Sequence, residues 1–180
     1  SAIKNTIIVS GLAAFITVIL GLLMVYGIRL SGRSLPQAIL PLTTIGYAAP
    51  GAVLGIGILV PLGIADNWVA DRVLDLTGYD PGLIFTGTAF AIILAYCVRF
   101  FSIAQHTVDG AFGRISPSLP NAAQSLGRNK LQVLLQIYRP LISTSTATAL
   151  LLIFVDCVKE LPATMLLRPF NFETLATRVH

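Results

Sequence analysis

The stretch Thr6–Ile28, TIIVSGLAAFITVILGLLMVYGI, carries no charged side chain in 23 consecutive residues. A helix needs about 20 apolar residues to cross the hydrocarbon core of a bilayer. In that core every backbone N–H and C=O must find a partner within the protein, and a helix provides these partners by itself. The stretch therefore predicts a transmembrane helix, which ends where Arg29 and Arg33 follow.

The rest of the chain continues this pattern of long apolar stretches. Three of them predict further spans: Pro50–Ile64, Gly82–Val98 and Pro140–Val155. Between the first two of these, Asp66–Asp80 contains four aspartates and predicts a polar loop. Prolines interrupt the charge-free residues 34–65, and a proline breaks a helix because it lacks an N–H and clashes with the preceding turn. We therefore expect a short helix or a re-entrant piece around Gln37–Ile45.

Glycines are concentrated at the start of the second span. They are Gly46, Gly51, Gly55 and Gly57. Two explanations remain open: either the backbone bends in this region, or another helix packs closely against the missing side chains.

The composition excludes several classes of protein. Of the 180 residues, 55% are hydrophobic and only 11% are charged, with a mean hydropathy of +0.82, whereas soluble domains carry about 25% charged residues. The basic residues behind the net charge of +4 are scattered between apolar stretches, so we expect no nucleic-acid partner. Cys97 and Cys157 lie within apolar stretches and predict buried thiols rather than a disulfide or a metal site, and no cofactor is expected.

The distribution of lysine and arginine indicates the orientation, because cytoplasmic loops are enriched in both. Arg29 and Arg33 follow the first span, whereas Arg72 is the only basic residue between the second and third spans. The connection between the third and fourth spans carries five: Arg99, Arg114, Arg128, Lys130 and Arg139. We expect this connection in the cytoplasm and residues 66–80 outside. The tail, Leu166–His180, is expected at the membrane interface.

The connection over residues 106–140 carries a spaced motif: Asn121-Ala122-Ala123, then Gly127, then Ile137 and Pro140. It resembles the signature loop of ABC importer permeases, in which Glu-Ala-Ala is followed by glycine and by Ile-x-Leu-Pro. Asn121 stands in place of the glutamate, and Arg139 in place of the leucine. The resemblance implies an all-α, polytopic transmembrane bundle of the MetI-like type I permease fold in a bacterial inner membrane. It also implies that the loop docks on a cytoplasmic ABC ATPase dimer, with coupling roles for Asn121, Ala122, Ala123, Gly127, Ile137 and Pro140.

The chemistry of these residues is typical of two short helices. Pro120 suits the first turn of a helix, Gly127 suits a helix end, and Asn129 can cap a second helix. Alanines on a short exposed helix let a partner approach closely, and the glycine turn sets the angle between the helices. An ordinary amphipathic loop on the membrane surface is the alternative.

Further segments resemble the ferric-iron branch of these permeases, namely Gly46–Gly51, Val155–Thr164 and Leu167–Thr177. In that branch the permease commonly consists of two fused, homologous halves. The resemblance therefore implies a single permease domain, residues 1–180, which has about four spans and lacks the final span of its half. It also implies a second permease half, an extracytoplasmic substrate-binding protein and membrane lipid as partners. Permeases for thiamine, polyamines, phosphonates and sulfate are similar, so the substrate stays open between these and ferric iron.

Charged residues stand near the end of the fourth span. Asp156, Lys159 and Glu160 are spaced i, i+3 and i+4, which puts them on one face of a continuous helix. Pro162 bends or ends that helix, and we predict an ion pair between Asp156 and Lys159. Charges are costly at the bilayer centre, so these residues either snorkel to the far interface or, together with Pro162, line a polar translocation path. We favour the path.

Other functions need features that the sequence lacks. It has no G-x-x-x-x-G-K-[ST] phosphate-binding motif, so the chain is not itself the ATPase. A membrane-embedded enzyme would need a nucleophile with its base, or metal ligands, inside the spans, and no histidine lies in a predicted span. We therefore expect no enzyme. An ion channel or secondary transporter, with the proline-broken residues 41–61 as a discontinuous helix, stays open, although a channel has no use for the signature loop.

Overall fold

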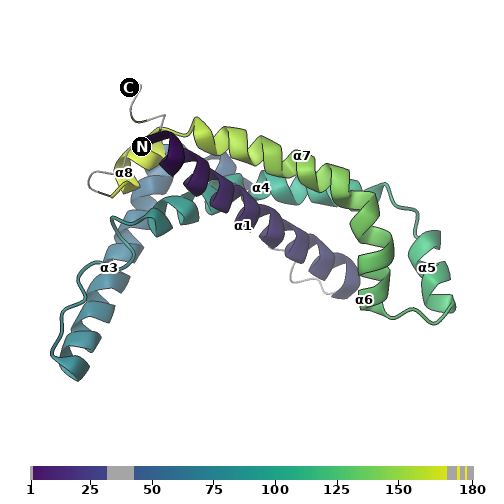
Figure 1. The fold of residues 1–180 in the computed structure, drawn as a ribbon, viewed down its shortest axis with the longest axis horizontal. Coiled ribbons are helices and arrows are strands. Elements are labelled where there is room, and N and C mark those ends of the chain that lie inside the picture. The colour runs from purple at the N-terminus through teal and green to yellow at the C-terminus, as the bar shows by residue number, and fades with distance from the viewer. Residues whose placement is uncertain (1, 32–42, 170–173, 175–176, 178–180) are drawn as a thin grey trace.

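The computed structural model describes residues 2–31, 43–169, 174 and 177, and all of the regular secondary structure within these residues is helical (Figure 1). The long helices are α1 (Ala2–Ser31), α3 (Gly51–Thr77), α4 (Ala89–Gly113) and α7 (Arg139–Val158). The short ones are α5 (Ser118–Ser125), α6 (Lys130–Val133), α8 (Pro162–Leu167) and the π-helix η1 (Leu134–Tyr138), which joins α6 to α7. Four described helical stretches are long and apolar enough to cross a membrane: α1 to Arg29, α3, α4 and Lys130–Val158. The predicted all-α class is confirmed.

Helices α1, α4 and α7 pack side by side (Figure 1). Arg29, near the end of α1, forms an ion pair of 2.8 Å with Asp109 near the end of α4, so these two helices run parallel. Ile142, near the start of α7, lies in the same apolar cluster as Val108, which is also near the end of α4. Helix α7 is therefore antiparallel to both.

Small side chains allow this close packing. A Cβ atom on Gly21 of α1 would lie only 3.0 Å from the Cβ atom of Ala104 on α4. Several alanines between the three helices are completely buried: Ala13, Ala91, Ala95, Ala104 and Ala149. Because lipid tails are as apolar as the side chains, close packing through small residues is a main source of helix association in membranes.

Helix α3 is longer than predicted, because it runs through most of the predicted polar loop and ends only at Thr77. The carboxylate of Asp66 is buried and accepts hydrogen bonds from the backbone N–H groups of Ile84, Phe85 and Thr86, at 2.7–2.8 Å, and from the Thr86 hydroxyl. Asp66, the first of the four aspartates, therefore fixes the connection between α3 and α4 by capping its backbone N–H groups. The helix ends where Gly78 adopts φ 69°.

Helix α4 differs from the predicted third span at both ends. It begins at Ala89 instead of Gly82, because the preceding residues fold over Asp66. It also continues through Arg99 to Gly113, so the interpretation of Arg99 as the end of the span is wrong. A charged residue does not stop a helix when a partner elsewhere in the fold neutralises it. The longer helix places His106 inside a candidate span, contrary to the sequence-based expectation.

The described part of the region rich in proline and glycine, residues 43–65, contains a break in the helical backbone. Residues 43–48 are helical, Pro50 separates them from α3, and Pro61 lies inside α3. Of the predicted short helix at Gln37–Ile45, residues 37–42 lie outside the described residues, as does most of the tail after Pro169. Both explanations for the glycines hold, because the chain breaks and Gly46 also lies against the backbone of Val98.

We predict that Asp66→Asn destabilises the protein. An amide offers one acceptor oxygen where the carboxylate offers two, so donors of the 84–86 backbone lose their partner in a buried site. Leaving such a group unsatisfied costs about 1–3 kcal/mol. Denaturant unfolding of the purified protein in detergent micelles measures the loss. Asp71→Asn, at an exposed aspartate of the same helix, is the matched control, and equal stability of the two variants contradicts the capping role.

Candidate functional site

Arg99 lies near the middle of a membrane-spanning helix. It follows the first residue of α4 by ten positions and precedes the last by fourteen, which correspond to about 15 Å and 21 Å along the helix axis. An unpaired arginine at such a depth is strongly disfavoured, so intramembrane charges face the protein interior and find partners there. The partners of Arg99 therefore show where the protein interior is polar.

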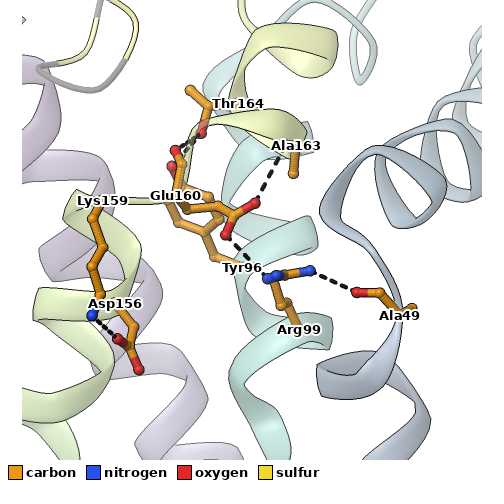
Figure 2. Close-up of polar contacts among 8 residues, drawn as sticks. All are labelled: Ala49, Tyr96, Arg99, Asp156, Lys159, Glu160, Ala163 and Thr164. Atoms are coloured by element: carbon orange, nitrogen blue, oxygen red, sulfur yellow. Dashed lines mark hydrogen bonds and ion pairs between the residues drawn. The ribbon is translucent and has the colours of Figure 1, made fainter. Parts of the chain in front are cut away.

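Two different segments of the chain contact the Arg99 guanidinium, one through a backbone carbonyl and one through a carboxylate (Figure 2). Its Nη1 donates a 2.8 Å hydrogen bond to the carbonyl oxygen of Ala49. Its Nε lies 3.1 Å from Oε2 of Glu160, close enough for an ion pair although not aligned as a hydrogen bond. The two side chains are only 19% and 8% exposed. The pair is thus largely removed from solvent. In such a buried environment the attraction between opposite charges is stronger than at a water-exposed surface.

Each of the two segments reaches Arg99 because a proline interrupts a helix. The carbonyl of Ala49 stands just before Pro50, at the break that precedes α3. Helix α7 ends at Val158, and α8 begins at Pro162, so Glu160 lies in the gap between them. The predicted helix break near Pro162 is present, but α7 ends at Val158, before the proline, and Pro162 is the first residue of α8. The prediction that Glu160 shares a helical face with Asp156 fails, because the helix has already ended and Glu160 turns toward α4.

A chain of hydrogen bonds fixes helix α8 against α4 (Figure 2). The Thr164 hydroxyl donates to the backbone carbonyl of Glu160 at 2.8 Å. That hydroxyl has a single proton, so it accepts from the Tyr96 hydroxyl of α4, whose oxygen lies 2.5 Å away. The backbone N–H of Ala163 also donates to Oε1 of Glu160, at 3.4 Å. These bonds satisfy polar groups that the helix break would leave without partners in an apolar interior.

The predicted ion pair between Asp156 and Lys159 is present, with 2.8 Å between the charged atoms. It is more open than the Arg99–Glu160 pair, because the two side chains are 27% and 68% exposed. Together with Tyr47 and the Arg99–Glu160 pair, these residues line a polar cavity of about 370 Å³.

The second predicted site lies at the opposite end of the bundle, where α5 and α6 form the two short helices expected from the motif (Figure 1). Gly127 adopts φ 85°. The N–H groups of Gly127 and Arg128 donate to the carbonyls of Gln124 and Ala123, which ends α5 in a Schellman motif. Asn129 then begins α6 with a capping box that includes Gln132. The predicted end at Gly127 and the cap at Asn129 are confirmed.

The surface of these two short helices is largely open. Asn121, Ala122 and Pro140 are exposed, Ile137 is half-buried and Ala123 is buried. Leucines that a water-facing loop would normally bury are also exposed, and Leu126 reaches 84%. An open apolar surface on a small helical hairpin is typical of a protein-binding surface.

Arg99 is the site residue that sequence reasoning missed. It was interpreted as the end of a span, although the apolar residues Phe100, Phe101 and Ile103 continue the stretch directly after it. A single arginine inside a long apolar stretch is itself the signal for an interior ion pair. Its partner Glu160 was recognised as a candidate, but the sequence gives no indication of which cation it contacts.

Comparison with known proteins identifies the class. Residues 9–168 match the family described as the binding-protein-dependent transport system inner membrane component. Since the match covers most of the chain, the chain belongs to this family of ABC importer permeases, which have the MetI-like fold. It is therefore a multi-pass inner-membrane transport component and not an enzyme.

Among individual relatives, the chain is similar to the Fe(3+)-transport system permease protein FbpB 2 of Haemophilus influenzae, with 29% identity over 179 residues. It is also similar to the ferric transport system permease protein FbpB of Actinobacillus pleuropneumoniae, with 27% identity over 186 residues. Both alignments cover 99% of this chain, but only 32% and 26% of the relatives. The chain thus spans less than a third of the length of either curated relative.

We predict that Gly51→Ala disturbs the interior ion pair. A Cβ atom at Gly51 would collide with Oε1 of Glu160 and would stand 3.3 Å from Cβ of Pro162. Overpacking of this kind costs about 1–3 kcal/mol. Detergent-solubilised protein should melt at a lower temperature. Gly57→Ala, on the same helix with nothing within 4 Å of the new atom, should be neutral or stabilising; equal melting of the two variants would exclude the steric constraint.

Proposed function

We propose that this chain forms part of the transmembrane pathway of an importer for ferric iron and couples that pathway to a separate ATPase. The observation that carries the proposal is the pair of open short helices α5 and α6 at one end of a membrane-spanning bundle. The names of the ferric-transport relatives support the substrate.

The coupling element in this proposal is the loop over residues 106–140. The residues proposed to couple it to an ABC ATPase dimer are Asn121, Ala122, Ala123, Gly127, Ile137 and Pro140; Ala123 is buried and acts from beneath the docking surface. The Schellman motif at Gly127 and the capping box at Asn129 support this role, because they fix the angle between α5 and α6 without a large core. An amide at Asn121 can only hydrogen-bond to a basic group of the ATPase, where a glutamate would form an ion pair.

The translocation path in this proposal runs past Asp156, Lys159, Glu160 and Pro162. Two observations support an interior position over snorkelling at the far interface. The group lies level with Arg99, in the middle of α4, and α4 extends about 15 Å further toward its own first residue. The same residues also surround a polar cavity.

The described residues suit a path better than a metal-binding cage. They hold no group of three or more His, Cys, Asp or Glu side chains placed to bind a metal ion. Asp156 and Glu160 are each paired with a cation, so neither carboxylate is free to bind Fe³⁺. In this proposal a separate extracytoplasmic binding protein selects the substrate, and the pathway lets it pass with little binding of its own.

The intact permease in this proposal contains more than this chain. We propose that residues 1–180 form one permease domain, which pairs with a second half. The relatives support this reading, because each is more than three times as long as the aligned region. A permease for another small solute, such as thiamine, a polyamine, phosphonate or sulfate, is the alternative that the fold allows.

We predict that Gly127→Val weakens the coupling between the permease and its ATPase. Valine is strained at φ 85°, and a left-handed conformation costs an L-residue about 1–2 kcal/mol, which reduces the docked form by roughly 5- to 30-fold. Uptake of radioactive ferric iron into proteoliposomes that contain the complete importer should fall together with the ATPase activity stimulated by the binding protein. Insertion into the membrane should be unchanged.

The matched control is Gly110→Val, which places the same side chain in α4, where nothing lies within 4 Å of the new Cβ atom. It should transport like the unaltered protein. Normal uptake and stimulation in Gly127→Val would refute the coupling role. Uptake of thiamine but not of iron by the unaltered importer would refute the substrate and leave the coupling role standing.

A further inference from the structure

A long apolar groove lies on the outside of the bundle, away from the polar cavity. It has a volume of about 540 Å³ and is enclosed by α1, the end of α4, η1 and α7. Its walls are apolar along most of their length, with Leu22 and Leu23 on α1 facing Ile142 and Leu150 on α7. The π-helical turn of η1 contributes a further wall, and such turns interrupt regular helices mostly at functional positions.

One end of the groove carries a positive charge. Arg139 lines the groove at the first residue of α7, and its side chain forms no ion pair or hydrogen bond with any residue that the structure describes. The two polar groups beside it already have partners. Tyr26 donates to the carbonyl of Lys130, and Ser143 donates to the carbonyl of Pro140. The guanidinium is thus the group at this end that lacks a counter-charge.

The charged end of the groove coincides with the end of the bundle where other basic residues gather. Arg29 pairs with Asp109 at this end, and Arg114 donates to Ser145 of α7. From Arg139 to Leu150 the groove follows α7 for eleven residues, about 16 Å along the axis. The groove thus has a charged end near the membrane surface and an apolar length that leads toward the bilayer centre. These two parts match the headgroup and an acyl chain of a phospholipid.

We propose that this groove binds one anionic phospholipid, with its phosphate on Arg139 and an acyl chain between α1 and α7. An apolar helix of another protein segment would fill the channel but leave the arginine without a counter-charge, whereas an anionic headgroup neutralises it. Basic pockets between transmembrane helices on the cytoplasmic side favour such headgroups. Arg139 is also the residue that stands in place of leucine in the signature loop.

The site is tested by brominated lipids, which quench a nearby tryptophan. Reporters are introduced in the full-length protein in a tryptophan-free background that includes Trp68→Phe: Leu23→Trp in the groove, and Ile56→Trp on the exposed side of α3 as a control. Brominated phosphatidylglycerol should quench the groove reporter with about fivefold higher affinity than brominated phosphatidylcholine. Arg139→Leu should abolish this preference, and Arg139→Lys should keep part of it. The control reporter should show no preference.

Native mass spectrometry checks the same site without a tryptophan in the groove. One phosphatidylglycerol should stay bound to the unaltered protein and to Arg128→Leu, which removes an exposed charge outside the groove, but not to Arg139→Leu. Equal quenching by the two lipids, or a preference that survives Arg139→Leu, would overturn the proposal. Absence of quenching by either lipid would overturn it too, because another protein segment then covers the groove.

Discussion

The structure depends on the ion pair between Arg99 and Glu160. A single charge near the middle of a membrane helix costs roughly 2.5–3.5 kcal/mol on insertion scales, so α4 accommodates Arg99 only because the fold brings a counter-charge to it. The same guanidinium binds the carbonyl of Ala49, which the break before α3 leaves without a helical partner. The Arg99 side chain thus provides a partner for a polar group at each of two helix breaks, the one before α3 and the one between α7 and α8.

This arrangement divides the molecule into parts with different roles. Helices α1, α4 and α7 pack through alanine and glycine into a dense unit, whereas α3 and α8 join that unit at the two breaks around Arg99. Helices α6, η1 and α7 form one continuous helical stretch, Lys130–Val158, about 43 Å long. The α5–α6 hairpin and the interior ion pair are therefore connected by a single element, and the polar cavity lies at its far end.

Local rules predicted much of this fold from the sequence. Four long apolar stretches predicted the four long helices, Gly127 predicted the end of α5, and Asn129 predicted the start of α6. The i, i+3 spacing also gave the ion pair between Asp156 and Lys159. Each of these features depends on residues close together in the chain.

The features that could not be predicted depend on residues far apart in the chain. Arg99 and Asp66 were both interpreted as boundaries, because a charge at the edge of an apolar stretch usually faces water. Their partners, Glu160 and the 84–86 backbone, lie 61 and about 20 residues away, and no periodic pattern connects them. Where such a partner exists, the helix continues past the charge, which explains why α3 and α4 are longer than predicted.

The most direct test of this account is a double-mutant cycle with Arg99→Ala, Glu160→Ala and the double variant, measured as free energy of unfolding in detergent micelles. Each single change should cost about 3–5 kcal/mol, because it leaves one charge buried without a partner. The double change should cost clearly less than the sum, since it leaves no unpaired charge. Costs that add without coupling would contradict the account, because Arg99 and Glu160 would then not depend on each other.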